Sequence, residues 1–254
     1  MVNKRRRDAL KAIGSAPLAV MAAGTVTSAA ATENNVEAEL WMSDGSVSGY
    51  FLEPESSPAG AVILIHEWWG LNDQIRNVVP RFAEAGFLSL AVDLYQGQVT
   101  NDPGTARELM GDVHPDIATE TLTTWVDWLR DHPKSNGKVG TVGWCFGGGW
   151  SLNASIATPV DATVIYYGRC AKGREEVQSL SGPVMGHFAT RDEWINQEMV
   201  SGFEQAMDAA GKTYSNFWYE ADHGFANPTT ARHDAEDAGL AWNRTLEFFN
   251  QHLS

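Results

Sequence analysis

A strand and a helix meet in one short segment of the chain, Thr141-Val142-Gly143-Trp144-Cys145-Phe146-Gly147-Gly148-Gly149-Trp150. A β-prone run from residue 138 leads into it, and helical spacing follows from Phe146 to residue 157. Residues 143–147 have the form of a nucleophile elbow, G-x-S-x-G, with cysteine in place of serine. The glycines suit a turn whose flanking positions lie too close together for a Cβ. Such a turn exposes the Cys145 thiol and leaves the Phe146 N–H free to donate to an oxyanion.

The same pattern also fits a structural cysteine that is buried in a glycine-rich turn. The chain contains two cysteines, Cys145 and Cys170, which do not make a disulfide framework. In an oxidising compartment the two could form one bridge, and that bridge would remove the thiol from the elbow. A nucleophile and a disulfide partner are therefore competing interpretations of Cys145.

Composition and charge limit the class of protein. With 254 residues, 43% of them apolar, the chain is long enough for one substantial α/β domain. The net charge is −14, and residues 1–31 contribute +4, so the remainder carries −18. A body this acidic repels nucleic acid and anionic membranes, which excludes both as expected partners. The chain has only six lysines, and its acidic residues are spread along the whole sequence. This composition favours a surface adapted to high salt, and an ordinary acidic soluble protein is the alternative.

The first 31 residues have the parts of an export signal. A basic stretch, Lys4-Arg5-Arg6-Arg7, precedes a weakly apolar run that ends in small residues. Paired arginines before an Ala/Gly-rich segment resemble a twin-arginine signal. We therefore expect export across the cytoplasmic membrane, with cleavage in residues 29–32 and no stable membrane span afterwards. An uncleaved anchor is the alternative.

Residues 36–254 alternate between strand-like and helix-like segments. The expected strands are 36–42, 47–52, 61–65, 87–92, 138–143, 162–167, 183–188 and 214–219. The expected helices are 72–85, 103–130, 146–157, 175–180, 195–210 and 231–252, with breaks near Pro80 and at 113–115. This order predicts an α/β domain: a mostly parallel, doubly wound sheet with helices on both faces and an N-terminal β-hairpin. Its ligand site should lie at the carboxyl ends of the strands.

An elbow of this kind requires an acid and then a histidine further along the chain. Asp192 follows the strand 183–188, and His223 follows the strand 214–219. His223 can move the thiol proton, while Asp192 fixes the tautomer of His223 and stabilises its imidazolium form. Taken singly, Asp192 could be a helix cap and His223 a surface loop residue. Their order and their positions after strands favour the triad Cys145–His223–Asp192.

Several ordered motifs together resemble the dienelactone hydrolase family. They are His66-Glu67-Trp68-Trp69-Gly70-Leu71-Asn72, Asp93-Leu94-Tyr95, Gly143 to Gly148, Gly186-His187-Phe188 leading to Asp192, and His223-Gly224-Phe225. The resemblance covers residues 36–252. It implies the α/β-hydrolase fold and hydrolysis of small-molecule lactones or other esters through an acyl-thioester on Cys145. We expect no cofactor, and we expect a monomer.

The resemblance also implies roles for residues 67 and 68. Glu67 corresponds to a carboxylate that hydrogen-bonds the resting thiol and helps to deprotonate it, which suits a partly buried acid. The Trp68 N–H would be the second oxyanion donor beside that of Phe146. A set of tryptophans could line an apolar pocket, although some must simply be core: Trp68, Trp69, Trp144, Trp150 and Trp194.

The chain departs from the family pattern at one point. Family members that act on carboxylate-bearing dienelactones use arginines to hold that carboxylate. The position four residues after the catalytic histidine is Asn227 here, and we expect Asn227 to contact substrate in place of an arginine. Arg107 is the only candidate for the second arginine between Leu94 and Leu129, and Arg169 could substitute from the next strand end. The sequence therefore predicts an ester or lactone hydrolase without identifying a dienelactone as its substrate.

Two other classes of protein remain alternatives. An exported binding protein on the same scaffold would be supported by a disulfide between Cys145 and Cys170. A metal-dependent hydrolase is the weaker one, because His66, Glu67 and His187 do not form a recognised ligand spacing and the chain has no H-E-x-x-H motif. We therefore expect no metal.

Overall fold

The computed structural model describes residues 36–42 and 45–254. The expected export signal at residues 1–31 and its cleavage region lie outside these residues, and the export prediction stays a prediction. In the described ranges, no helix combines the length and the apolar character that a membrane crossing requires.

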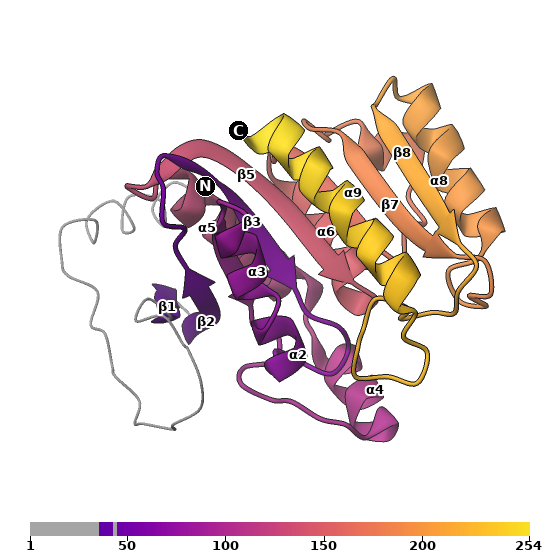
Figure 1. The fold of residues 1–254 in the computed structure, drawn as a ribbon, viewed down its shortest axis with the longest axis horizontal. Helices are drawn as coiled ribbons and strands as arrows, with labels where there is room; N and C mark the ends of the chain where they lie inside the picture. The colour runs from indigo at the N-terminus through magenta and orange to yellow at the C-terminus, as the bar shows by residue number, and fades with distance from the viewer. Residues whose placement is uncertain (1–35, 43–44) are drawn as a thin grey trace.

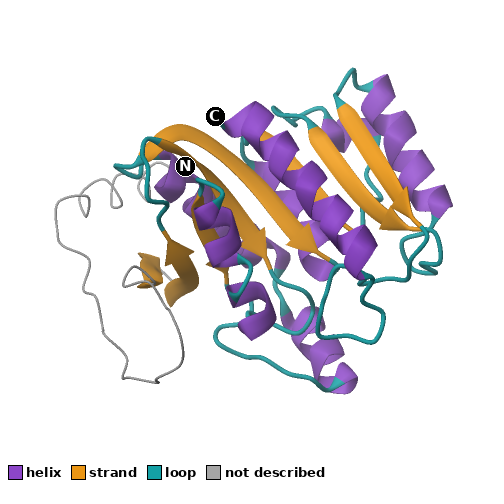
Figure 2. Ribbon diagram, in the orientation of Figure 1, coloured by secondary structure: helices purple, strands orange, loops and turns teal. Residues whose placement is uncertain are grey.

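One eight-stranded sheet organises the described residues, in the order β1-β2-β4-β3-β5-β6-β7-β8. The strands are β1 (Val36–Met42), β2 (Gly45–Leu52), β3 (Ala59–Ile65), β4 (Leu88–Val92), β5 (Ser135–Trp144), β6 (Ala162–Tyr166), β7 (Val184–Ala189) and β8 (Tyr214–Tyr219). The pairs β1–β2 and β2–β4 are antiparallel, and every other pair is parallel. The predicted hairpin and the predicted mostly parallel sheet are therefore both confirmed. Figure 2 shows the parallel strands pointing toward the same edge of the sheet.

Helices cover both faces of this sheet, as predicted. They are α2 (Asp73–Arg76), α3 (Val79–Glu84), α4 (Pro103–Asp112), α5 (Pro115–Arg130), α6 (Phe146–Ala157), α7 (Arg174–Val177), α8 (Gln197–Ala209) and α9 (Ala235–Leu253). In β3, Val62 and Leu64 pack toward α3 and α9, whereas Ile63 and Ile65 pack toward α5. The strand is buried along its whole length, which is the pattern of a central parallel strand. Figure 1 shows α3 and α9 lying across one face of the sheet.

Local side chains set most helix boundaries close to the expected ones. The helix expected at 72–85 is two helices, because the chain leaves the helix after Arg76 and restarts at Val79, with Pro80 in the new first turn. Asn72 caps the first of them by accepting from the Ile75 N–H. The last helix begins at Ala235 rather than residue 231, because the Asp234 carboxylate caps it.

A buried network of hydrogen bonds holds α9 against the sheet. The His187 ring lies 2.9 Å from the Tyr219 hydroxyl and 3.0 Å from the Thr245 hydroxyl, which in turn lies 2.7 Å from the hydroxyl of Tyr166. Burial, together with the nearby Arg244 charge, lowers the pKa of His187 to about 3, so this histidine is neutral. From its position on β7, His187 therefore contacts α9 through Nε2 and the neighbouring strand β8 through Nδ1.

Candidate active site

The elbow forms at the carboxyl end of β5. Cys145 has φ = 55°, a left-handed conformation that a non-glycine residue rarely adopts, and its N–H donates to Tyr166 O on the neighbouring β6. A Cβ added at Gly143 would lie 1.9 Å from Gly147 O, and one at Gly147 would lie 2.1 Å from Ile65 O. Both glycines are required because backbone crosses at each position.

Two backbone N–H groups converge on the sulfur of Cys145. One belongs to Phe146, at the start of α6, and the other to Trp68, in the loop after β3. His66 orients that loop: Leu94 N donates to His66 Nε2 at 3.1 Å, so the proton lies on Nδ1, which donates to Glu67 O at 2.6 Å. The two donors that the sequence suggested for an oxyanion hole therefore face the same atom.

The thiol of Cys145 is protonated at rest. Burial, together with the carboxylates of Glu67 and Asp192, raises its pKa to about 12, although the N–H groups of Phe146 and Trp68 act in the opposite direction. A thiol with such a pKa is a poor nucleophile at neutral pH. Reaction therefore needs a base that acts when substrate is present.

Asp192 and His223 lie in contact at the ends of β7 and β8. His223 Nδ1 is 2.6 Å from Asp192 Oδ2, while the other carboxylate oxygen accepts from Trp194 N at 2.9 Å and from Ile195 N at 3.0 Å. Burial opposes ionisation of Asp192, but the hydrogen bonds from His223 and from the backbone outweigh it and lower the pKa of Asp192. Asp192 thus orients the imidazole and also holds the loop before α8, which begins at Gln197 rather than residue 195.

Glu67 is buried between two neutral donors. Tyr167 OH donates to Oε1 at 3.2 Å, and the Asn227 amide donates to Oε2. Burial raises the pKa of Glu67, whereas these hydrogen bonds and the charges of His223 and Arg232 lower it. Asn227 was expected to contact substrate, but it is 1% exposed and its Oδ1 accepts from Thr229 N at 2.9 Å. The structure therefore places Asn227 on Glu67 rather than at an open surface.

Tyr167 is a site residue that the sequence analysis did not identify. Its backbone has φ = 36°, and its ring packs edge-on against His223 at 5.1 Å and against Phe225 at 5.4 Å. It thus touches both the histidine and, through its hydroxyl, Glu67. A usable signal was present, because a tyrosine directly after the buried strand β6 lies at the carboxyl edge of the sheet.

The tryptophans divide between the core and the mouth of the site. Trp144 is buried core beside Tyr166, and Trp150 packs against Phe146 on α6. Trp69 packs against Trp68 with ring centroids 4.7 Å apart and the ring planes tilted by 58°. Trp194 is 64% exposed and meets His223 edge-on at 5.1 Å. Trp194 and the Trp68–Trp69 pair are thus the tryptophans beside reactive groups.

The expected arginines lie at the surface. Arg107 is exposed on α4, and Arg169 is exposed after β6. A third arginine, Arg232, lies 5.9 Å from the centroid of the Trp194 ring and acts electrostatically on Glu67. Arg232 is therefore the arginine whose charge reaches the buried carboxylate, and sequence spacing did not point to it.

Both cysteines are free thiols in this structure. Cys170 is buried against Leu152 and Phe188, in a different packing cluster from Cys145. The bridge on which the binding-protein alternative depended is not formed. Within residues 36–42 and 45–254, no three His, Cys, Asp or Glu side chains are grouped as a metal site would require.

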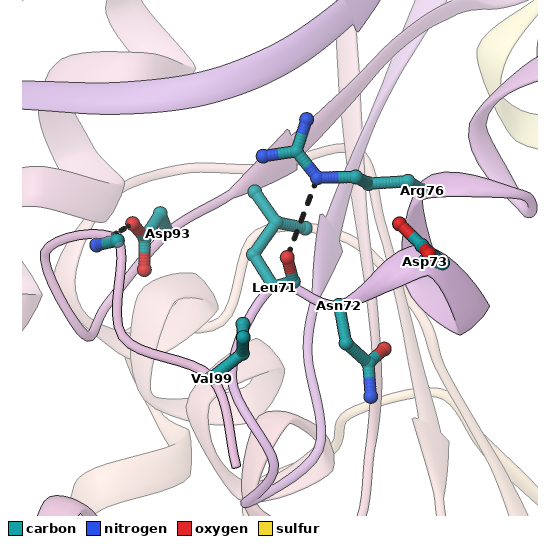
Figure 3. Close-up of a pocket in the computed structure, with 7 residues that line it drawn as sticks. Leu71, Asn72, Asp73, Arg76, Asp93 and Val99 are labelled. Carbon is teal, nitrogen blue, oxygen red and sulfur yellow. Dashed lines mark hydrogen bonds between the residues drawn. The ribbon is translucent and has the colours of Figure 1, made fainter. Parts of the chain in front are cut away.

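A separate hollow of about 280 Å³ lies between the loops that follow β3 and β4. Figure 3 shows its lining side chains, which are Leu71, Asn72, Asp73, Arg76, Asp93 and Val99. Arg76 Nε donates to Leu71 O at 3.4 Å across it. None of the triad residues lines this hollow.

Comparisons with known proteins agree with one another on family and fold. The dienelactone hydrolase family matches residues 47–253. Protein usf of Aquifex pyrophilus is 32% identical over 82% of this chain and 94% of its own, and carboxymethylenebutenolidase 1 of Cupriavidus pinatubonensis is 28% identical over 81% and 92%. A proposed dienelactone hydrolase of Klebsiella pneumoniae superposes with a TM-score of 0.77 at 27% identity, over 86% of this chain and 99% of that one. The expected α/β-hydrolase fold is confirmed.

Proposed function

Because this chain belongs to the dienelactone hydrolase family, we propose that it hydrolyses carboxylic esters or lactones with Cys145 as its nucleophile. One observation carries the proposal. The sulfur of Cys145, held out by a left-handed turn, receives the N–H groups of both Phe146 and Trp68. A carbonyl carbon bonded to that sulfur would place its oxygen near the same two donors, which is the geometry of an oxyanion hole.

Acylation begins with removal of the thiol proton. Glu67 is the base we propose for this step, because its negative charge raises the pKa of the thiol and the donors Tyr167 and Asn227 hold its carboxylate in place. The thiolate attacks the carbonyl carbon, the C–S bond forms, and the oxyanion accepts from Phe146 and Trp68. Glu67 passes the thiol proton to its neighbour His223, which becomes an imidazolium. Collapse then breaks the ester C–O bond, and the leaving oxygen takes that proton from His223.

Deacylation reverses these roles at the same groups. His223, oriented by Asp192 at 2.6 Å, takes a proton from water. The resulting hydroxide adds to the thioester carbonyl, and the C–S bond then breaks. The carboxylic acid leaves, and the sulfur takes the proton from the imidazolium of His223, so the thiol state favoured by burial is restored.

The residues around Glu67 favour a neutral ester or lactone over a substrate that carries a carboxylate. Asn227 is neutral and donates to Glu67, and the side chains of Arg107 and Arg169 are exposed to solvent. The exposed indole of Trp194, beside His223, offers an apolar surface to the leaving group.

The test uses aryl acetates and simple lactones with the intact enzyme and with Cys170→Ser as the matched control. Treatment with iodoacetamide should abolish hydrolysis in both proteins, and mass spectrometry should locate the label on Cys145. His223→Ala should also lose activity. Full activity in protein labelled quantitatively at Cys145 would refute the nucleophile. Binding of these compounds without any turnover would instead favour the binding-protein alternative.

A further inference from the structure

Trp194 is the most exposed of the large apolar side chains in the part of the chain that the structure describes. It is 64% exposed, whereas the next of them, Val99, is 55% exposed. An isolated apolar side chain at a protein surface is common and needs no explanation by itself. Trp194 differs from such a residue in its neighbours, which include both the acid and the histidine proposed for catalysis.

These two residues hold the indole at the active site. Trp194 N donates to Asp192 Oδ1 at 2.9 Å, and Asp192 Oδ2 lies 2.6 Å from His223 Nδ1. The indole meets the His223 ring edge-on, with centroids 5.1 Å apart and planes at 87°. In the segment between β8 and α9, the guanidinium of Arg232 lies 5.9 Å from the indole centroid. The indole is therefore placed against the histidine, although most of its surface is open to solvent.

The chemistry of His223 decides which part of a substrate reaches Trp194. Because Asp192 occupies Nδ1 of His223, Nε2 is the nitrogen left to exchange protons with substrate. In acylation the leaving oxygen takes its proton from His223 as the C–O bond breaks, so this oxygen must come within ~3 Å of Nε2. The carbon group on the leaving oxygen consequently lies beside His223, where the open surface of the indole begins.

We propose that Trp194 determines specificity by packing against an aromatic ring in the alcohol portion of the ester. The substrates it favours are open-chain esters of benzylic or phenolic alcohols, which release the aromatic alcohol during acylation. A flat indole matches such a ring, and aromatic pairs contribute more than their buried area alone. A simple lactone gains nothing from this contact, because its alcohol portion is an aliphatic chain joined to the acyl group. This inference rests on the proposed function, because it takes His223 as the acid for the leaving oxygen.

The test uses three esters whose alcohols have similar acidity. Methyl acetate is the reference, benzyl acetate adds a phenyl ring on the alcohol side, and methyl phenylacetate adds the same ring on the acyl side. The variants are Trp194→Ala and Trp194→Phe, which both keep the backbone N–H that donates to Asp192. Leu240→Ala, at another exposed apolar side chain, on α9, is the matched control. For each enzyme, kcat/KM for the two phenyl-bearing esters is expressed as a ratio to that for methyl acetate.

The wild-type enzyme should hydrolyse benzyl acetate about 10- to 30-fold better than methyl acetate, the gain expected when a phenyl face is buried against the indole. Trp194→Ala should abolish this preference, Trp194→Phe should retain most of it, and Leu240→Ala should leave it unchanged. The ratio for methyl phenylacetate should be the same in all four enzymes. A disturbance of His223 would slow all three esters alike, so it cancels in these ratios.

A wild-type enzyme without the preference for benzyl acetate would overturn the proposal, as would a preference that survives in folded Trp194→Ala. A fall confined to methyl phenylacetate would also overturn it, because the indole would then contact the acyl group. In each of these cases hydrolysis can still depend on Cys145, so the inference can fail while the proposed function stands. Failure of the proposed function would instead appear as hydrolysis that survives quantitative labelling of Cys145.

Discussion

Asn227→Asp exchanges one nitrogen for oxygen in the contact that holds the buried carboxylate of Glu67. The two side chains have the same shape, and the oxygen that accepts from Thr229 N at 2.9 Å and Thr229 Oγ1 at 2.7 Å is retained. The donor to Glu67 Oε2 becomes a second carboxylate oxygen. The substitution therefore changes the protonation of Glu67 with little change in packing.

The expected effect is large because two carboxylates in contact cannot both ionise. At an effective dielectric constant of ~20, two charges ~4 Å apart repel by ~4 kcal/mol, equivalent to roughly three pKa units. Burial already raises the pKa of Glu67, so the pair should keep one proton through neutral pH. A protonated Glu67 cannot accept the thiol proton, and kcat/KM at pH 7 should fall about 100- to 1,000-fold. Activity should return as the pH rises and the pair loses its last proton.

The assay is a pH–rate profile for an aryl ester from pH 5 to 10. Asn216→Asp is the matched control, because Asn216 Nδ2 also donates to a glutamate, Glu204, at 3.5 Å, but at an exposed site. The control should keep the wild-type profile. An Asn227→Asp enzyme with a wild-type profile would show that Glu67 is not the base for the thiol, and the proposed acylation step would be wrong.

Two further substitutions test the buried acid and the elbow. Glu67→Gln should lose activity yet raise the unfolding temperature at pH 7.5 by about 2–4 °C, the shift for ~1 kcal/mol in a chain of this size. The raised pKa of Glu67 means that its ionised form opposes folding as pH rises, so this gain should vanish below about pH 4 in calorimetry. Gly147→Ala should destabilise by ~3 kcal/mol or more in urea titration, because its Cβ meets Ile65 O. Gly202→Ala, in open space on α8, should stabilise by ~0.5–1 kcal/mol, and equal effects at both glycines would contradict the steric argument.

Features governed by neighbouring residues could be predicted from the chain alone. The elbow depends on glycines two residues either side of Cys145, and the break between α4 and α5 depends on Pro115 in the first turn of α5. The burial of β3 follows from its uninterrupted run of apolar residues. The start of α2 follows from Asn72, whose amide oxygen caps it. The positions of Asp192 and His223 just after the ends of β7 and β8 could likewise be predicted from the neighbouring residues. Backbone sterics and side-chain period act over a few residues, so a sequence records them directly.

Contacts between distant segments came only from the tertiary structure. Asn227 and Glu67 are 160 residues apart in the sequence, and Tyr167 and Glu67 are 100 apart. Their meeting depends on the register of β3 beside β5 and of β5 beside β6. The strand order β4-β3-β5-β6 decides which loops adjoin, and no local pattern encodes it.

The sequence by itself thus determined the kind of turn that carries Cys145 and the order of the acid and the histidine after it. The tertiary structure decided which neutral groups surround Glu67. The physical reason is that a strained turn is a property of its own glycines. The protonation of a buried acid or thiol depends instead on every donor and charge that the whole fold brings within a few ångströms.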